Sequence, residues 1–238
     1  RLRQANNSPA PECLAGHSLG EYTALVAGGA LDFADAVSLV ALRGKLMQEA
    51  VPAGEGAMAA ILGLDDDLVR QLCNDSANGE VVEAVNFNSP GQVVIAGNSA
   101  AVERAMAAAK AAGAKRALPL PVSAPSHCAL MKPAAQKLAE KLTTLTIKAP
   151  QIPVLHNANV STATTAAAIA ELLAQQLHSP VRWVETIQAI HARGISTVIE
   201  AGPGKVLTGL CKRIEKQVSG LGVYDQASFD KFMEAINA

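Results

Sequence analysis

Residues 16–22 read GHSLGEY and set Ser18 between two glycines in the pattern GxSxG. An apolar strand-like stretch precedes this segment, and an apolar helical pattern follows it. A GxSxG motif between a strand and a helix is typical of a nucleophile elbow, in which both glycines permit a strained turn and a close approach of helix to strand. The alternative is a glycine-rich connector whose serine only caps a helix. The context favours Ser18 as a nucleophile.

The residue after the serine has a predicted role of its own. In an elbow, the backbone N–H that follows the nucleophile points toward the same place as the hydroxyl. Here that N–H belongs to Leu19, at the start of a helix whose N-terminus carries a partial positive charge. We therefore expect Leu19 to donate a hydrogen bond to an oxyanion.

An arginine falls on the apolar stripe of the helix predicted for residues 32–50. Arg43 lies among the apolar residues of that stripe, which are Ala36, Leu39, Val40, Leu46, Met47 and Ala50. Burial of an unpaired guanidinium is costly, so Arg43 must pair with an internal carboxylate, reach solvent with its tip, or bind the carboxylate of a ligand. Arginine suits bidentate binding of a carboxylate. Its place on the helix after the elbow favours the ligand.

A serine nucleophile requires a base within hydrogen-bond reach. The candidates are His17, His127, His156, His178 and His191. His127 is favoured because it lies in a loop that precedes a helix, where functional residues are common and where the helix N-terminus disfavours the imidazolium. His156, at the end of a predicted strand, stays open as an alternative.

Two kinds of element pattern alternate along the chain. Between residues 55 and 122 the order strand–helix–strand–strand–helix–strand predicts a ferredoxin-like subdomain. The expected elements are 57–62, 66–75, 81–87, 92–96, 99–112 and 115–120. Residues 1–54 and 123–238 form the predicted large domain, into which this subdomain is inserted. Alternating strands and helices there indicate an α/β fold with a parallel sheet covered by helices on both faces. Its expected elements are a strand at 11–15, helices to 27 and at 32–50, a helix to 145, a strand at 152–156, helices at 166–177 and 181–192, a strand at 195–201 and a helix at 206–216.

Composition and charge exclude several classes of protein. The net charge of −1 argues against a general nucleic-acid binder, which needs a basic excess. No apolar run approaches the ~18 residues that span a bilayer. The four cysteines are far apart and form no CxxC pair, so we expect no metal site and no disulfide, and reduced thiols in the cytoplasm. The chain opens at Arg1 without a methionine, which indicates a fragment.

Beyond these local patterns, a series of longer segments resembles the malonyl-CoA:acyl carrier protein transacylase family. In chain order they read GHSLGEY, ALRGKLMQEAVP, NFNSPGQVVIAG, PVSAPSHCALMKP and EAGPGKVLTGL. The likeness runs from about residue 15 to residue 214 without an obvious gap. It implies an α/β-hydrolase-like core that carries a ferredoxin-like subdomain.

The resemblance also implies roles for particular residues. Ser18 is the acylated nucleophile, His127 is its base, and Arg43 binds the free carboxylate of the malonyl group. Leu19 supplies one oxyanion donor. The backbone carbonyl at Gln176 orients the histidine in place of an aspartate.

The implied reaction takes malonyl from malonyl-CoA to the pantetheine thiol of acyl carrier protein, for fatty acid synthesis. Coenzyme A and phosphopantetheine thioesters are then substrates, and no cofactor or metal is expected. The implied enzyme is a cytoplasmic monomer with no nucleic-acid or membrane partner.

One departure and two alternatives accompany the resemblance. The family begins with a strand and a GQG motif that gives a second oxyanion donor, and this sequence contains no such motif. Loss of one donor typically costs on the order of a hundred-fold in rate. An inactive truncated acyltransferase is therefore one alternative. A serine hydrolase or thioesterase is the other, although it would require an Asp or Glu between the serine and a late histidine.

Overall fold

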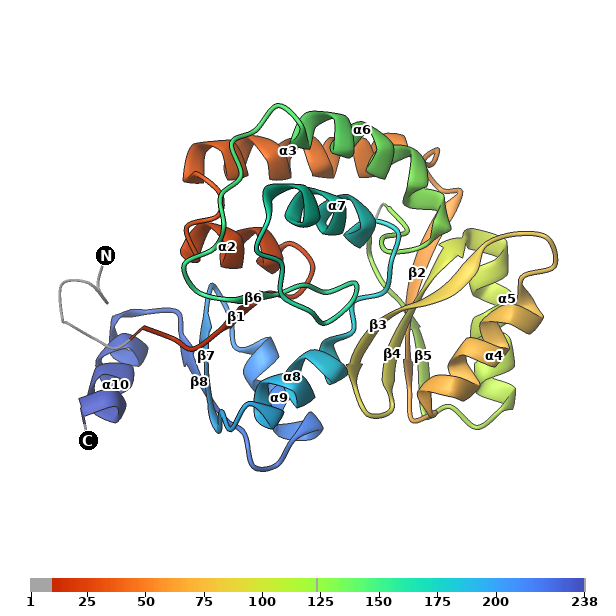
Figure 1. Ribbon diagram of the computed structural model, residues 1–238. Coiled ribbons are helices and arrows are strands. Elements are labelled where there is room, and N and C mark those ends of the chain that lie inside the picture. Colours follow the sequence, from red (N-terminus) through yellow and green to blue (C-terminus); the bar gives the residue numbers. More distant parts are fainter. Residues whose placement is uncertain (1–9, 123, 238) are drawn as a thin grey trace.

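The computed structural model describes residues 10–122 and 124–237. It is a mixed α/β fold with parallel and antiparallel sheets (Figure 1). The predicted start of the second large-domain segment at residue 123, and residues 1–9 and 238 of that domain, lie outside the described residues.

The elbow region follows the predicted order of strand, turn and two helices. Strand β1 (Leu14–Ala15) leads into helix α2 (Gly20–Ala27) and then helix α3 (Phe33–Glu49). Asp32 caps α3, because its Oδ1 accepts a hydrogen bond from the Ala34 N–H at 2.8 Å. The strand is shorter than the predicted 11–15, since only its last two residues pair with a neighbour, the parallel strand β6 (Val154–Leu155).

Residues 56–119 form a four-stranded antiparallel sheet with two helices. Their order along the chain is β2 (Gly56–Leu62), α4 (Asp66–Ser76), β3 (Val82–Ser89), β4 (Gln92–Asn98), α5 (Ser99–Ala111) and β5 (Arg116–Pro119). The spatial order of the strands is β3-β4-β2-β5. Helices α4 and α5 lie together on one face of this sheet (Figure 1). The element order is the one the sequence predicts, with ends that differ by a few residues.

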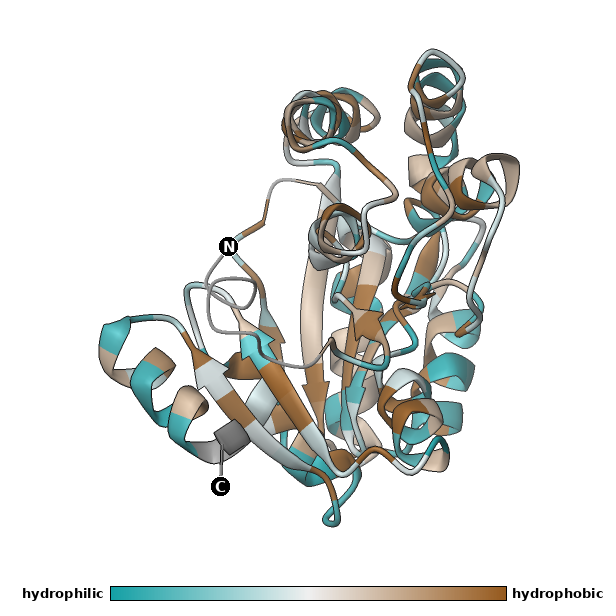
Figure 2. Cartoon of the chain, turned by 60° about the vertical axis from the view of Figure 1, so that its left-hand side comes forward, coloured by the Kyte–Doolittle hydropathy of each residue, from teal (hydrophilic) through white to brown (hydrophobic). Residues whose placement is uncertain are grey.

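Strands β2, β3 and β4 bury residues on both faces of the antiparallel sheet, which agrees with the apolar runs in β2 and β4. Ile61 and Ile95 point toward α4 and α5, while Met58 and Val94 belong to a second cluster on the other face. Cys128 packs into that second cluster and ties the loop after the subdomain to the sheet. Figure 2 shows the hydrophobic colour concentrated on the strands, with hydrophilic turns on the outer helices.

The rest of the chain adds helices around two short parallel strand pairs. Its elements are η1 (Ala129–Met131), α6 (Lys132–Leu142), β6, α7 (Ala166–Gln176), α8 (Trp183–Ala192), β7 (Thr197–Ala201), α9 (Val206–Ile214), β8 (Ser219–Val223) and α10 (Gln226–Asn237). Among the described residues the expected parallel sheet consists of the separate pairs β1-β6 and β7-β8. The sequence analysis predicts neither β8 nor α10. Strand β8 is not recognised because the glycines at 220 and 222 weaken its strand pattern.

Main-chain hydrogen bonds attach the small sheet to the rest of the molecule beside the elbow. The Val181 N–H donates to the Val85 carbonyl at 2.8 Å, and the Phe87 N–H donates to the Val181 carbonyl at 3.0 Å. Nearby, the His127 N–H donates to the Leu177 carbonyl at 2.9 Å. These bonds bring the loop after the small sheet and the end of α7 toward the turn before α2.

None of the helices in the described ranges combines the length and the apolar character that crossing a membrane requires.

Candidate active site

The turn between β1 and α2 holds Ser18 in a strained backbone conformation. Ser18 has φ of +50°, which side-chain-bearing residues seldom adopt. A Cβ at Gly16 would lie 2.0 Å from the backbone carbon and oxygen of Gly20, so only glycine fits there. At Gly20, by contrast, a Cβ would meet nothing within 4 Å and φ is not positive. The expectation that both glycines permit the close approach therefore holds at Gly16 and is wrong at Gly20, whose backbone is what Gly16 approaches.

His127 is the histidine that reaches the serine. Its Nε2 lies 2.7 Å from Ser18 Oγ, and its Nδ1 lies 2.8 Å from the main-chain carbonyl oxygen of Gln176. A carbonyl can only accept, so Nδ1 carries the proton and Nε2 accepts from the serine hydroxyl. His127 also has positive φ, at +68°, which turns its buried ring back toward the elbow. The Gln176 carbonyl therefore lies within hydrogen-bond reach of the His127 ring, and its orienting role stays a prediction.

The environment keeps His127 neutral. Burial, followed by the nearby positive charge of Arg43, lowers the pKa of His127 to about 3, against a partial opposing effect of the Gln176 hydrogen bond. A neutral imidazole with a free Nε2 lone pair can accept the proton of a serine. The histidine is therefore in the base form throughout the neutral pH range.

Arg43 is buried beside the serine and has no carboxylate partner. Its side chain is 6% exposed, and its Nη2 donates to Ser18 Oγ at 3.1 Å and to Gln176 Oε1 at 3.2 Å. The guanidinium also lies over the Tyr22 ring, 5.6 Å from the ring centre. Among the described residues no Asp or Glu forms an ion pair with Arg43, and its Nε has no hydrogen-bond partner. Of the three options open in the sequence, the internal ion pair and the solvent-reaching tip are absent.

Leu19 begins the turn of α2 at the position expected for an oxyanion donor. It occupies the N-cap of α2, where the first N–H groups of a helix have no partner within the helix. Within the described part of the chain, the Leu19 N–H donates to no protein acceptor. It is free to bind a developing negative charge next to Ser18.

Among the described residues no other histidine forms a hydrogen bond with the Ser18 hydroxyl. His17 Nε2 lies 2.8 Å from Asn88 Oδ1, and burial lowers the pKa of His17. His156 Nδ1 lies 2.7 Å from Glu21 Oε1, with both side chains fully buried. His178 and His191 are only partly buried and form no side-chain hydrogen bond to the serine. The alternative of His156 as the base is therefore wrong on geometry.

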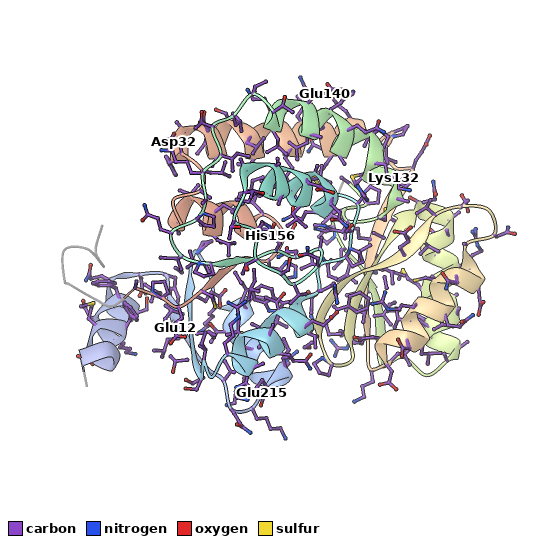
Figure 3. All side chains as sticks on the ribbon, in the orientation of Figure 1. Glu12, Asp32, Lys132, Glu140, His156 and Glu215 are labelled. Atoms are coloured by element: carbon purple, nitrogen blue, oxygen red, sulfur yellow. The ribbon has the colours of Figure 1, made fainter. Side chains whose placement is uncertain are left out.

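Two residues of the site, Glu21 and Asn157, escape prediction from the sequence. The Asn157 side chain accepts from the Ser18 N–H at 2.6 Å and donates to the Gly16 carbonyl at 2.7 Å, which fixes the elbow. Glu21 accepts hydrogen bonds from the Asn157 N–H and from His156, and Figure 3 shows His156 near the centre of the molecule. From the sequence, an acidic residue in the first turn of a helix is expected to be exposed to solvent. The burial of Glu21 follows only from the packing of distant segments around it. The one sequence signal is the polar HNAN run directly after a buried strand.

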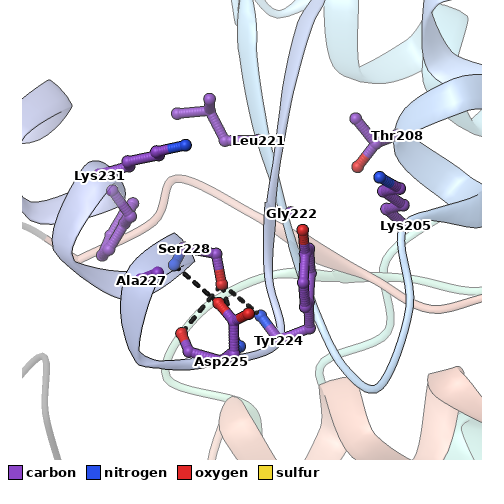
Figure 4. Close-up of a pocket in the computed structure, with 10 residues that line it drawn as sticks. Lys205, Thr208, Leu221, Gly222, Tyr224, Asp225, Ala227, Ser228 and Lys231 are labelled. Carbon is purple, nitrogen blue, oxygen red and sulfur yellow. Dashed lines mark hydrogen bonds between the residues drawn. The ribbon is translucent and has the colours of Figure 1, made fainter.

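A cleft of about 330 Å³ opens next to the elbow. It lies between the β3–β4 hairpin and helix α9 and is lined by His17, Asn88, Gln92, Val206, Leu207 and Leu210. A second hollow of about 210 Å³ lies between α9, β8 and α10, with Lys205, Tyr224 and Lys231 in its wall (Figure 4). Ser18 and His127 line neither hollow, and the first cleft reaches the elbow at His17. Within the described residues no cluster of three or more His, Cys, Asp or Glu side chains could hold a metal ion.

Known proteins share the sequence and the fold of this chain. Residues 4–228 match the family described as the acyl transferase domain. The fold and this match together define an acyltransferase. The chain is 60% identical over 214 residues to the malonyl CoA-acyl carrier protein transacylase of Escherichia coli K12, and the match covers 90% of this chain and 69% of the relative. With the enzyme of the same name from Bacillus subtilis it shares 49% identity over 227 residues, covering 95% of this chain and 72% of the relative.

Solved structures give the same result. An acyl carrier protein S-malonyltransferase from Vibrio cholerae superposes with a TM-score of 0.96 at 58% identity, covering 98% of this chain and 76% of that one. A malonyl-transacylase in complex with its type II PKS acyl-carrier protein superposes with a TM-score of 0.97 at 55% identity, covering 99% and 76%. Within the acyltransferases, the chain belongs to the malonyl CoA-acyl carrier protein transacylase family.

The contrast between the two glycines of the elbow can be tested by substitution. We expect Gly16→Ala to lower the free energy of unfolding by about 2 kcal/mol or more, because the new methyl group overlaps the backbone of Gly20. Gly20→Ala should leave stability unchanged or raise it by up to about 1 kcal/mol, because alanine is the better helix former. Urea denaturation of both variants measures the difference. Equal losses at the two positions would contradict the geometry of the turn.

The low pKa of His127 predicts how Ser18 reactivity depends on pH. We expect phosphonylation of Ser18 by a fluorophosphonate to keep its rate within about twofold between about pH 7.5 and about pH 5.5, because the imidazole stays neutral there. Intact-mass spectrometry follows the labelling, with Ser18→Ala as the unlabelled control. A rate that falls with a midpoint near the ordinary histidine pKa would overturn this assignment.

Protein stability sets the lower limit of that experiment. The folded-state pKa of His127 is below its unfolded value, so the unfolded chain binds the proton first. Its contribution to stability is present above about pH 6.5 and declines as the pH falls. Circular dichroism at each pH separates loss of fold from loss of the base.

Proposed function

We propose that this chain transfers the malonyl group of malonyl-CoA to the phosphopantetheine thiol of acyl carrier protein through a malonyl ester of Ser18. The proposal agrees with the family to which the chain belongs, and the transfer supplies malonyl units for fatty acid synthesis. The roles of Ser18, His127, Arg43, Leu19 and Gln176 below are part of the proposal.

The observation that carries the proposal is the buried guanidinium of Arg43. It lies 3.1 Å from the nucleophilic oxygen and has no carboxylate partner among the described residues. Burial of a charge without a counter-ion is costly, and the cost is offset when a ligand brings the missing anion. A malonyl group carries a carboxylate two bonds from its thioester carbonyl. Its carboxylate can therefore pair with Arg43 while the carbonyl lies at Ser18.

In the first half-reaction the serine takes the acyl group. His127 Nε2 accepts the hydroxyl proton as Ser18 Oγ attacks the thioester carbonyl, and the Leu19 N–H stabilises the oxyanion. The carbon–sulfur bond then breaks and the imidazolium protonates the departing thiolate of coenzyme A. The Gln176 carbonyl, 2.8 Å from Nδ1, holds the ring in place and stabilises the positive charge.

In the second half-reaction the acceptor thiol replaces the serine. His127 accepts the thiol proton, the sulfur attacks the malonyl ester, and a second oxyanion forms at the same donor. Its collapse expels Ser18 Oγ, which takes the proton back from the imidazolium. Arg43 holds the carboxylate through both steps, so the acyl group does not need to be released and rebound.

The cleft beside the elbow suits the arm that both substrates share. Its α9 wall is apolar through Val206, Leu207 and Leu210, while Asn88 and Gln92 present amides from the β3–β4 hairpin. A pantetheine arm alternates amide groups with short apolar links, which matches this lining. We infer that the arm of either donor or acceptor lies here, with its sulfur toward Ser18.

The finer description of the fold is also part of the proposal. The β3-β4-β2-β5 order and the two helices on one face support a ferredoxin-like subdomain at residues 55–122. The parallel pairs and surrounding helices support an α/β-hydrolase-like core formed by residues 1–54 and 123–238. We further expect the protein to be a monomer, to work in the cytoplasm, and to need no resident cofactor, since both thioesters act as substrates.

A trapping experiment tests the function directly. Incubation with malonyl-CoA alone should add one malonyl group to the chain, mapped to Ser18 by peptide mass, and holo acyl carrier protein should then remove it as malonyl-carrier. Ser18→Ala should do neither. Steady release of free malonate without any thiol acceptor would indicate a hydrolase instead. Absence of the adduct on a folded chain would indicate an inactive acyltransferase.

Removal of the buried cation should change the choice of acyl donor. We expect Arg43→Ala to lower kcat/KM for malonyl-CoA about ten- to a hundred-fold more than for acetyl-CoA, because only malonyl loses a charged partner. Arg70→Ala, at an exposed arginine that stacks on Phe87 in the small sheet, serves as the matched control and should change neither value. An unchanged malonyl-to-acetyl ratio in Arg43→Ala would contradict the assignment.

A further inference from the structure

Glu21 is a fully buried carboxylate beneath the elbow that the reaction itself does not use. It is 0% exposed and accepts three hydrogen bonds. The donors are the ring Nδ1 of His156 at 2.7 Å, the main-chain N–H of Asn157 at 2.9 Å and the side-chain amide of Gln176 at 2.8 Å. Each of these donors belongs to a segment distant in sequence. Glu21 is thus a point at which the elbow helix, the loop after β6 and the end of α7 meet.

The Gln176 amide connects this carboxylate to the reacting groups. Its Nε2 has two hydrogens, of which one goes to Glu21 Oε2 and the other to the Ser18 carbonyl at 3.0 Å. With both hydrogens engaged, Oε1 faces Arg43 and accepts from its Nη2 at 3.2 Å. The main chain of the same residue accepts from His127. One glutamine therefore contacts the elbow, the cation and the base.

The position of that amide depends in part on Glu21. A half-turn of the amide is opposed by three contacts, because Glu21 and the Ser18 carbonyl accept from its Nε2 and its Oε1 accepts from Arg43. Without an acceptor at the Glu21 position, one amide hydrogen would be left without a partner in a buried place, and the amide would shift to regain one. Its Oε1 would then hold the Arg43 Nη2 less closely next to Ser18.

We propose that Glu21 is a positioning residue for acyl selectivity: through the Gln176 amide it holds Arg43 where a carboxylated acyl group is bound. The inference rests on the proposed function, because selectivity for malonyl is what it explains. The main-chain N–H of Glu21 donates to the Ser18 carbonyl at 3.0 Å, but its carboxylate contacts neither the Ser18 hydroxyl nor the His127 ring. Its effect must therefore fall on the choice between donors more than on the chemistry common to all of them.

Two substitutions of similar size separate the roles of the carboxylate. Glu21→Met removes every acceptor, and we expect the malonyl-to-acetyl ratio of kcat/KM to fall about tenfold. Glu21→Gln keeps one oxygen for Asn157 and Gln176, while its NH₂ faces His156, whose ring can accept at Nδ1 by carrying its proton on Nε2. We expect Glu21→Gln to retain the wild-type ratio within about twofold.

A matched control distinguishes positioning from loss of stability. Thr186→Val removes another fully buried polar group, the hydroxyl that donates to the Arg182 carbonyl at 2.8 Å, outside the active site. It should lower the melting temperature and leave the malonyl-to-acetyl ratio unchanged. A wild-type ratio in Glu21→Met, or an equal loss of ratio in all three variants, would overturn the role of Glu21.

A spectroscopic measurement keeps this test apart from the test of function. If the wild-type chain transfers no malonyl group, the proposed function fails. The ¹⁵N NMR signals of the Arg43 guanidinium then still test whether Glu21 positions Arg43. We expect Glu21→Met to shift the Arg43 signals, and Glu21→Gln and Thr186→Val to leave them in place. Unshifted Arg43 signals in Glu21→Met would overturn the inference whatever the activity.

Discussion

A positive charge buried beside a nucleophile is the constraint on which the site depends. Arg43 contacts the Ser18 hydroxyl yet has no acidic neighbour among the described residues, so the folded protein tolerates a charge that it does not neutralise. Amide oxygen and an aromatic face, from Gln176 and Tyr22, offset part of that cost. The arrangement is stable enough to persist and leaves the anion to be supplied from outside. In the proposed function, the same unpaired charge that is costly to bury is the one that selects a carboxylated acyl group.

The same charge shapes the chemistry of the base. Burial and Arg43 both oppose a second positive charge on His127, so the histidine rests in the form that accepts a proton. A substrate carboxylate next to Arg43 would cancel part of this opposition and make the imidazolium easier to form at the moment it is needed. The His127 ring meets a neutral acceptor on its other side, the Gln176 carbonyl at 2.8 Å from Nδ1, which adds no negative charge near Arg43.

Local patterns in the sequence contain much of the fold and part of the site. The sequence predicts the elbow, the helix with Arg43 and the element order of the small sheet, because each depends on neighbours within a few residues. It does not predict the contacts of Glu21, Asn157 and the Gln176 amide, because these form only when segments more than a hundred residues apart meet. The role of Gly20 is misread for a related reason: GxSxG is symmetric as a string, whereas only Gly16 faces the packed backbone. Strand β8 is not predicted, because its glycines weaken the strand pattern in the sequence.

The hydrogen bonds between Val181 and strand β3 have a further consequence for how the molecule moves. A hinge between the antiparallel sheet and the rest of the protein would have to break both of them in a buried setting, where lost main-chain bonds are expensive. These two bonds therefore hold β3, and with it the β3–β4 wall of the cleft, against the segment before α8. The opposite wall is helix α9, which carries the exposed Val206 at its first position.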